Sequence, residues 1–385
     1  MGGGEHATAL QADLSANLPA NLPANRPANL SANLPADLLA WLQASADALD
    51  TTPDLASEIV PRLAGAGLFA IGVPASLGGK GGTMTDAIEA IAAVAGHSLA
   101  ASFVFWGQRT FIEYLLQSPN EALRGRWLGP LMRGECAGAT GLSNAMKFLS
   151  GIESLQITAT PNDDGWQLDG ALAWITNLRK EGFIAAAAVN SAGDLPPAVV
   201  AFISDRAGVA RSSDLELMAL RGSNTAAVKL DAVQIGADDV LHPNARAWLP
   251  GVRPSFLGLQ CGMSIGLARA SLRAAHALAG AARGPLLAQI ETEQAALEEN
   301  VRALKAGVAD GRFKTAAAPM FRLRIALAGN VAQAVMLELQ ASGGRAYLVD
   351  RDRSFARRWR ESAFVPIITP SLTQLQAELH KHAAA

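Results

Sequence analysis

The sequence predicts an α+β protein of several domains: an N-terminal helical domain, a central antiparallel β-barrel domain and a C-terminal helical bundle. Two changes of periodicity predict this order. Apolar residues have helical spacing from residue 36, alternate as in strands between about Cys136 and Leu241, and return to helical spacing after Pro250. The 385 residues are enough for two or three domains of ordinary size, and we place them at residues 35–133, 134–245 and 246–385.

Residues 1–34 precede these domains and contain a short repeat of the type Ala-Asn-Leu-Pro. A proline in every fourth position removes helix donors and clashes with the preceding turn, so a regular helix is excluded. We therefore interpret residues 1–34 as a low-complexity, disordered arm. Expansion of a short repeat explains the arm better than a partner-binding role.

The N-terminal domain is predicted to contain helices that begin near residues 37 and 54 and helices over about 84–96 and 100–117. The last of these helices carries five aromatic residues, which form either core or one wall of a pocket: Phe103, Phe105, Trp106, Phe111 and Tyr114. The glycine cluster at residues 78–82 lacks the Gly-Lys-Ser/Thr ending of a phosphate loop, so we interpret it as a turn.

The central domain is predicted to contain strands over residues 155–160, 166–169, 171–177, 184–189, 198–203 and 225–233. Short strands at this spacing are typical of a small antiparallel barrel. Long helices are then predicted over about 256–279, 286–305 and 316–341, and shorter ones near 355–364 and 372–382.

Composition excludes several functional classes. Half of the residues are hydrophobic, yet the sequence contains no apolar run of the roughly 20 residues that a bilayer requires, so we expect no membrane association. A net charge of −2 without a dense basic run argues against nucleic-acid binding. Cys136 and Cys261 are the two cysteines and offer neither a disulfide framework nor a metal-ligand spacing. With no secretory signal at the N-terminus, we expect a cytoplasmic protein and no bound metal.

The predicted strand over residues 171–177 carries the strongest chemical signal. Side chains alternate along a strand, so Leu172, Trp174 and Thr176 share one face. An aromatic plate beside a hydroxyl donor is what a bound flavin ring requires. A buried tryptophan beside a strand threonine is the structural alternative.

In this order of domains, residues 37–380 resemble the acyl-CoA dehydrogenase superfamily of flavoproteins. Residues 174–177 (Trp-Ile-Thr-Asn) resemble the strand that stacks a tryptophan beside the flavin and directs a threonine to its N5 edge. Residues 140–143 (Thr-Gly-Leu-Ser) resemble the segment that meets the pyrimidine side of the ring, and residues 220–225 resemble the entry to a late barrel strand. The resemblance implies flavin contacts from Thr140, Leu142, Ser143, Trp174 and Thr176.

The resemblance also implies contacts with the ADP part of FAD. Residues 340–344 (Gln-Ala-Ser-Gly-Gly) resemble a segment that reaches FAD across a subunit interface, through Gln340, Gly343 and Gly344. Arg283 remains from an arginine motif that holds the diphosphate. FAD is therefore the expected cofactor, with FMN as the alternative, and a homodimer or homotetramer formed through the helical bundle is the expected assembly.

The expected catalytic base is missing. The glutamate that removes the substrate α-proton in the family's dehydrogenases aligns with Thr369, and threonine is not a usable base near neutral pH. The second position used in the family falls near Phe256. Ser143, His97 and Glu361 remain as weak catalytic candidates, although the arginines beside Glu361 predict a structural ion pair.

Three functions are compatible with these residues. The first is a flavin-dependent oxidoreductase of the acyl-CoA dehydrogenase type with a displaced base, acting on an acyl or other small organic substrate. The second is a two-component monooxygenase of the same fold, which uses a C4a-hydroperoxide of flavin supplied by a flavin reductase and needs no carboxylate base. The third is a non-catalytic flavin-binding or structural homologue.

Overall fold

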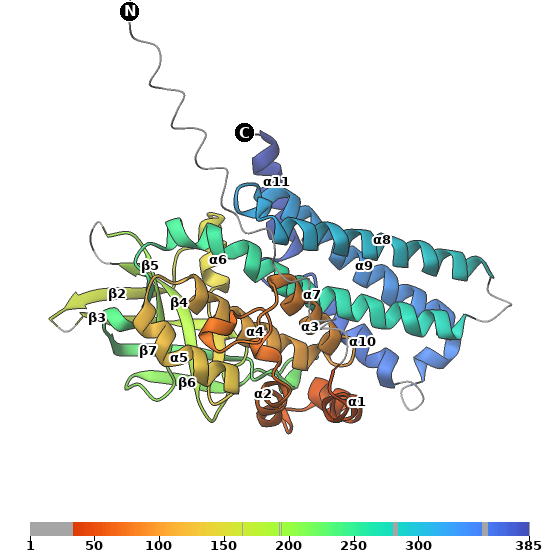
Figure 1. The fold of residues 1–385 in the computed structure, drawn as a ribbon, viewed down its shortest axis with the longest axis horizontal. Coiled ribbons are helices and arrows are strands. Elements are labelled where there is room, and N and C mark those ends of the chain that lie inside the picture. The colour runs from red at the N-terminus through yellow and green to blue at the C-terminus, as the bar shows by residue number, and fades with distance from the viewer. Residues whose placement is uncertain are drawn as a thin grey trace, which may run out of the picture.

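The computed structural model describes residues 34–163, 165–191, 193, 195–279, 284–348 and 353–384. The side chains of residues 353 and 382–384 are outside this description, as is nearly all of the predicted N-terminal arm. Helices, a sheet and a second set of helices follow one another along the chain, which confirms the predicted order (Figure 1).

Helices α1 to α5 form the first layer, and polar caps define where several of them begin. Their bounds are α1 (Ala36–Thr51), α2 (Ala56–Gly65), α3 (Met84–Ala95), α4 (Leu99–Gln117) and α5 (Glu121–Arg133). Thr83 and Asp86 form a capping box at α3, and Ser98 and Asn120 accept backbone N–H groups at the starts of α4 and α5. Helix α4 is buried on all sides because it packs against α3, α7 and strand β1.

The sheet has eight strands: β1 (Ala137–Thr140), β2 (Ile157–Asn162), β3 (Gly165–Ile175), β4 (Phe183–Ser191), β5 (Ala198–Ile203), β6 (Val209–Asp214), β7 (Ala226–Ile235) and β8 (Val240–His242). Their order is β6-β7-β3-β2-β4-β5-β8, and β1 pairs with β4. The β1–β4 and β2–β4 pairs are parallel. The other strand pairs are antiparallel, so the predicted antiparallel domain is confirmed, with these two pairs made by β4 as its parallel exceptions.

Strand β4 shows why the two cores meet at the sheet. Its run from Phe183 to Val189 is apolar without alternation, and both of its faces are buried. Ile184, Ala186 and Ala188 belong to the helical core, whereas the residues between them belong to a second core inside the sheet.

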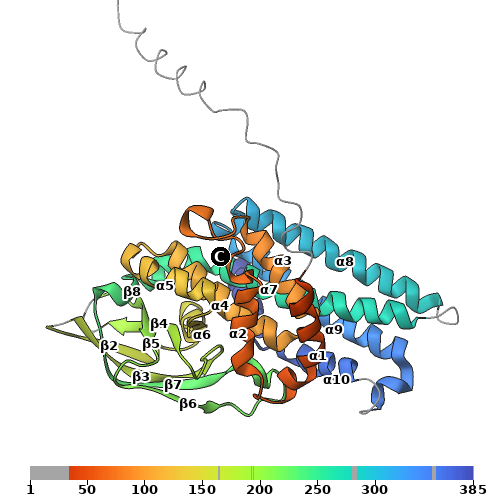
Figure 2. The same ribbon diagram turned by 60° about the horizontal axis from the view of Figure 1, so that its bottom comes forward.

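The C-terminal helices form the bundle at the other end of the molecule (Figures 1 and 2): α7 (Ala245–Leu278), α8 (Gly284–Ala309), α9 (Ala317–Ser342), α10 (Arg353–Phe364) and α11 (Leu372–Ala384). Helix α7 begins eleven residues before the predicted start at residue 256 and continues through Pro250 and Pro254. Prolines remove two helix donors, but Trp248 and neighbouring apolar side chains pack against α4 and hold this part of α7 in place.

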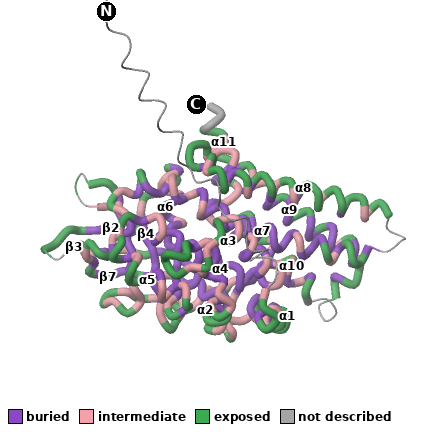
Figure 3. The backbone as a smooth tube through the Cα atoms, in the orientation of Figure 1, coloured by how far each residue is buried: buried purple, intermediate pink, exposed green. Residues whose placement is uncertain are grey.

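One segment, Ala317–Tyr347, is the only described helix that is long and apolar enough, by length and composition, to cross a membrane. The sequence analysis expected no apolar segment of this length. More than half of its apolar window is buried in the protein (56%), and Figure 3 colours part of α9 as buried. Arg324 and Glu338, both in α9, are buried as well. A core helix has the same composition.

Candidate active site

A cavity of about 540 Å³ lies where the end of β3, the first helical layer and the C-terminal segment meet. Its described lining residues are Phe103, Trp106, Thr140, Gly141, Ser143, Asn144, Lys147, Glu153, Gln156, Leu172, Ala173, Trp174, Thr176, Leu217, Met218, Ala219, Leu220, Thr225, Arg360, Ala363, Phe364, Ile367, Ile368, Thr369, Ser371 and Gln374. The cavity therefore brings together Thr140, Ser143, Trp174 and Thr176, which sequence motifs selected, and Thr369 from the base position.

The end of β3 presents Trp174 to the cavity. A register shift against β7 lies between Leu172 and Ile175, so one extra residue of β3 is accommodated there. Trp174 is 64% exposed, whereas the next two residues, Ile175 and Thr176, are buried. A large exposed indole at the end of this strand is a free stacking surface.

Asn177 fixes the chain directly after Thr176. It has a left-handed backbone (φ 61°), which asparagine tolerates better than most residues. Its Nδ2 donates to Gln108 Oε1 and to the Gly138 carbonyl oxygen, both at 2.9 Å. These bonds tie the end of β3 to α4 and β1, so the position of Thr176 depends on all three elements.

Three hydroxyl groups form a cluster at this strand end. Thr225 Oγ1 donates to Thr176 Oγ1 at 3.2 Å, and Thr176 Oγ1 donates to the Ser223 carbonyl oxygen at 3.2 Å. Ser223 Oγ and Thr225 Oγ1 lie 2.7 Å apart. The Thr176 hydroxyl therefore already has a donor and an acceptor within the protein.

The segment after β1 forms the neighbouring wall. Gly141 is required there, since a Cβ atom would lie 2.6 Å from the Ala186 carbonyl oxygen. Leu142 is fully buried and belongs to the helical core, so its side chain does not contribute to the lining. Ser143 begins a short helix, α6 (Ser143–Leu149), which the sequence analysis did not predict.

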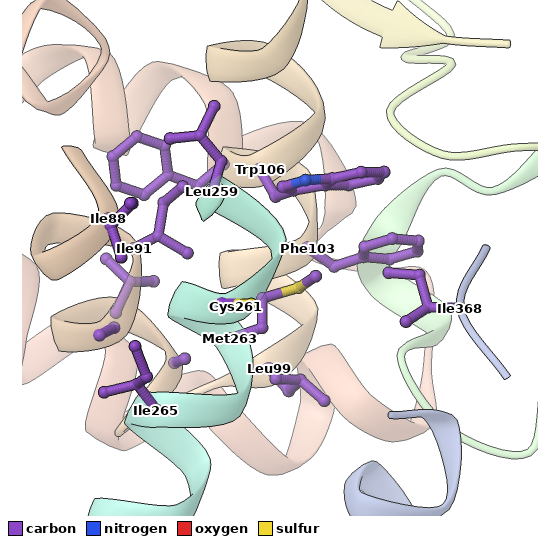
Figure 4. Packing of buried hydrophobic residues seen from close by; sticks show 14 of the residues in the cluster. Ile88, Ile91, Leu99, Phe103, Trp106, Leu259, Cys261, Met263, Ile265 and Ile368 are labelled. Carbon is purple, nitrogen blue, oxygen red and sulfur yellow. The ribbon is translucent and has the colours of Figure 1, made fainter. Parts of the chain in front are cut away.

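Another part of the cavity wall is aromatic. Phe103 and Trp106 of α4 stack with ring centroids 5.6 Å apart, and Phe364 of α10 meets Phe103 edge-on at 4.8 Å. Figure 4 shows the two α4 rings side by side, with Ile368 next to Phe103. Of the five aromatic residues noted in this helix, two therefore form a pocket wall, while Phe105, Phe111 and Tyr114 are core.

Thr369 lies on a loop whose backbone accepts hydrogen bonds from buried polar side chains. Gln260 Nε2 donates to the Thr369 carbonyl oxygen at 2.9 Å, and Gln260 Oε1 accepts from Arg324 Nε at 2.8 Å. Arg324 is fully buried and also donates to the Val365 carbonyl oxygen at 2.7 Å. The base position is thus well fixed, but it carries a threonine.

Two ion pairs reach the cavity. Arg360 donates from Nε and Nη2 to Oδ2 of the buried Asp50, at 2.9 and 2.7 Å. Glu153 accepts from Asn144 Nδ2 at 2.9 Å and from Lys147 Nζ at 3.3 Å. The sequence analysis missed Glu153, because no motif surrounds it and its place on the lining depends on how the loop after α6 folds back.

The weak candidates His97 and Glu361 lie outside the described cavity lining. Burial, then Arg273 and Arg357, lower the pKa of His97 below its usual value. Glu361 is buried and accepts the Leu99 N–H at the start of α4, at 2.9 Å. Burial raises the pKa of Glu361 to about 7, although Arg357 opposes the shift. Arg357 lies 3.7 Å from the Glu361 carboxylate, in agreement with the expected structural role.

The residues expected near the ADP part of FAD also lie outside this lining. Gln340 is exposed near the end of α9, and Gly343 ends that helix with φ 60°. Gly344 follows in a short 3₁₀ helix with open space around its Cα. Arg283 lies outside the described residues.

Comparisons with known proteins agree with this architecture. The family model of the acyl-CoA dehydrogenase N-terminal domain matches residues 40–135, from α1 to the end of α5. Probable acyl-CoA dehydrogenase YngJ of Bacillus subtilis is 26% identical over 61% of this chain and 63% of its own length. Mitochondrial isovaleryl-CoA dehydrogenase of Pongo abelii is 25% identical over 49% of this chain and 45% of its own length. The match thus spans less than two thirds of each relative.

Solved structures extend the likeness to the whole fold. Butyryl-CoA dehydrogenase from Megasphaera elsdenii has a TM-score of 0.77 at 18% identity, covering 92% of this chain and 99% of that one. KijD3, solved with FMN and a dTDP-linked sugar, has a TM-score of 0.75 at 20% identity, covering 91% of both chains. The dibenzothiophene monooxygenase TdsC from Paenibacillus sp. A11-2 has a TM-score of 0.71 at 17% identity, covering 89% and 94%.

Residues 40–135 match the acyl-CoA dehydrogenase N-terminal domain, the curated relatives include probable acyl-CoA dehydrogenases, and the solved structures show that the chain shares the fold of that superfamily. Because dehydrogenases and a monooxygenase share this fold, the fold does not select the reaction.

Proposed function

We propose that this protein is a flavin-dependent oxidoreductase that holds the flavin ring against Trp174. The exposure of Trp174 within the cavity is the observation that carries the proposal. A planar ligand that covered the indole would bury apolar surface that the protein leaves open, and the hydroxyl groups beside it suit the polar edge of a flavin.

Each wall of the cavity has a separate task in this proposal. Trp174 stacks on one side of the ring, and Thr140 and Ser143 meet its polar edge. Phe103 and Trp106 face the site from α4 and hold an apolar or aromatic substrate while excluding water. The bound flavin would supply hydride transfer or, once reduced, activation of oxygen.

The site for the ADP part of FAD would be completed by a second copy of the chain. Gln340, Gly343 and Gly344 are outside the cavity lining, which supports a role toward a neighbouring subunit's cofactor. We therefore propose a homodimer or homotetramer formed through the bundle. FMN lacks the ADP part and is the alternative cofactor. A monomer in size-exclusion chromatography that binds FAD stoichiometrically and more tightly than FMN would contradict this proposal.

Oxygen chemistry is the branch we favour, with reduced flavin supplied by a reductase. Thr369 occupies the base position, and Glu153 is the one carboxylate among the described lining residues. Asn144 and Lys147 already donate to its two oxygens, so the carboxylate is engaged within the protein. A monooxygenase needs no α-proton removal, so this lining suits it.

Dehydrogenation is the second candidate, and the position of Glu153 on the lining favours it. If substrate displaced Lys147, whose ammonium is 3.3 Å from the carboxylate, Glu153 would become free to accept a proton. Glu153→Gln would then abolish reduction of the flavin by substrate while leaving flavin binding intact.

Stopped-flow spectroscopy separates the two branches. The protein is reconstituted with FAD or FMN, then either mixed anaerobically with acyl-CoA thioesters or reduced and mixed with oxygen. We expect no reduction by the thioesters and rapid reaction of the reduced form with oxygen, unchanged in Glu153→Gln. Reduction by a thioester that Glu153→Gln abolishes would establish the dehydrogenase. Failure to bind either flavin would support a non-catalytic, structural role.

A further inference from the structure

The Thr140 hydroxyl forms a hydrogen bond with a buried tyrosine. Thr140 lies at the end of β1 and lines the cavity, while Tyr114 on α4 is fully buried. Their hydroxyl oxygens are 2.7 Å apart. In the described part of the chain, this is the only hydrogen bond of the Tyr114 hydroxyl, whose ring packs against Phe111 and Trp248.

The direction of this hydrogen bond follows from burial. Burial raises the pKa of the Tyr114 phenol, so the phenol keeps its proton. A buried O–H without an acceptor costs about 1–3 kcal/mol, and Thr140 Oγ1 is the acceptor within reach. Tyr114 therefore donates and Thr140 accepts.

The single hydroxyl hydrogen of Thr140 is then free to be donated elsewhere, and Thr140 is one of the residues that line the cavity. Thr176 differs, because its hydroxyl accepts from Thr225 and donates to the Ser223 carbonyl oxygen. We propose that Tyr114 is a positioning residue that makes Thr140, rather than Thr176, the main hydroxyl donor to the bound ligand. The site would accordingly select a ligand with a hydrogen-bond acceptor at Thr140, such as a carbonyl oxygen or ring nitrogen. This inference rests on the proposed flavin for the ligand's identity.

A double-mutant cycle tests the inference. Affinities for FAD and FMN are measured for the wild type, Tyr114→Phe, Thr140→Val and the double variant. Each single variant should weaken binding by about three- to tenfold, the range for one hydrogen bond. The double variant should bind no worse than Thr140→Val alone, since Tyr114 acts through Thr140. The reduction potential of the bound flavin should become more negative in all three, because a donor to the reduced ring is lost.

Two further variants exclude a general packing effect. Thr140→Ser keeps the hydroxyl and should bind nearly as the wild type does. Ser102→Ala removes another buried hydroxyl from α4, one that donates to the Ile91 carbonyl oxygen at 3.2 Å, and should leave affinity and potential unchanged. The inference is overturned, while the proposed function stands, if the wild type binds flavin and Tyr114→Phe binds it equally well. The same holds if the losses of affinity in Tyr114→Phe and Thr140→Val add in the double variant. A wild type that binds neither flavin overturns the proposed function with it.

Discussion

Trp174 exposes 64% of its surface, although Ile175 and Thr176, which follow it, are almost completely covered. A ligand ring stacked on it would gain about 1–3 kcal/mol from burial and aromatic contact. Trp174→Ala should therefore weaken flavin binding by roughly 10- to 100-fold, measured by titration of intrinsic and flavin fluorescence. The midpoint of unfolding should change little because the indole supports no core. Trp166→Phe, on the same strand but outside the cavity lining, is the matched control.

Glu361 gives the protein a predictable dependence on pH. Burial raises its pKa from 4.5 to about 7 in the folded state, so the folded protein holds this proton more tightly than the unfolded chain. Its contribution to stability is therefore full below pH 4.5 and is lost as the pH rises to about 7. Glu361→Gln keeps an acceptor for the Leu99 N–H and cannot ionise.

We expect Glu361→Gln and the wild type to unfold alike near pH 4, with the variant more stable at pH 8 by up to about 3 kcal/mol. Denaturant unfolding at both pH values measures the difference. Glu121→Gln, whose carboxylate side chain is 85% exposed, should show no such change. A gap between Glu361→Gln and wild type that is equal at both pH values would contradict the assigned role.

Sequence motifs could locate Trp174, Thr176, Thr140 and Ser143 at the cavity, because short segments carry their chemistry. Tyr114 and the aromatic wall could not be assigned. Helix α4 is buried on every side, so its sequence has no polar face that would show which aromatic residues turn toward the cavity. The Tyr114–Thr140 contact also joins two elements whose relative placement no local pattern encodes.

At the scale of elements, periodicity predicted most helices and strands but not their irregularities. The expected alternation in β3 is interrupted by the register shift near Trp174, and an extra residue leaves no trace in a short apolar pattern. Helical spacing was expected only after Pro250, although tertiary packing keeps both Pro250 and Pro254 inside α7.

Helices α3 and α7 pack closely through glycines spaced four residues apart: Gly258, Gly262 and Gly266. A Cβ on Gly266 would lie 2.1 Å from the Ala92 carbonyl oxygen, which is backbone and cannot move aside. Gly266→Ala should destabilise the protein by about 2–4 kcal/mol, as overpacking with a backbone shift does. Gly251→Ala in the same helix meets nothing within 4 Å and should be neutral or stabilising by up to about 1 kcal/mol. Equal effects in thermal unfolding would refute the close approach.

At the scale of the whole molecule, the cavity wall depends on contacts between the two ends of the chain. Asp50 at the end of α1 accepts the Leu220 N–H at 3.0 Å and the two Arg360 bonds. Leu220 has a left-handed backbone (φ 58°) and lines the cavity, as Arg360 does. The order of domains follows from periodicity, but a contact across 310 positions does not.

Asp50→Asn keeps an acceptor for Leu220 but removes the charge that pairs with Arg360. Since the Arg360 side chain is 31% exposed, water can compensate in part, and we expect a loss of about 1–3 kcal/mol in unfolding free energy. Flavin affinity should fall as well, because the wall loosens. Asp54→Asn, at an exposed position, should change neither quantity. Unaltered stability in Asp50→Asn would show that this pair does not hold the wall.

The central claim is that the cavity beside Trp174 binds a flavin, and an absorbance titration of the purified wild-type protein tests it most directly. FAD and FMN are each added to the protein under conditions that favour the oligomer. We predict saturable binding of at least one of them with a stoichiometry of one per chain, a shifted flavin spectrum and quenched tryptophan fluorescence. A flavin spectrum that stays that of the free cofactor at every protein concentration, for both flavins, would contradict the claim.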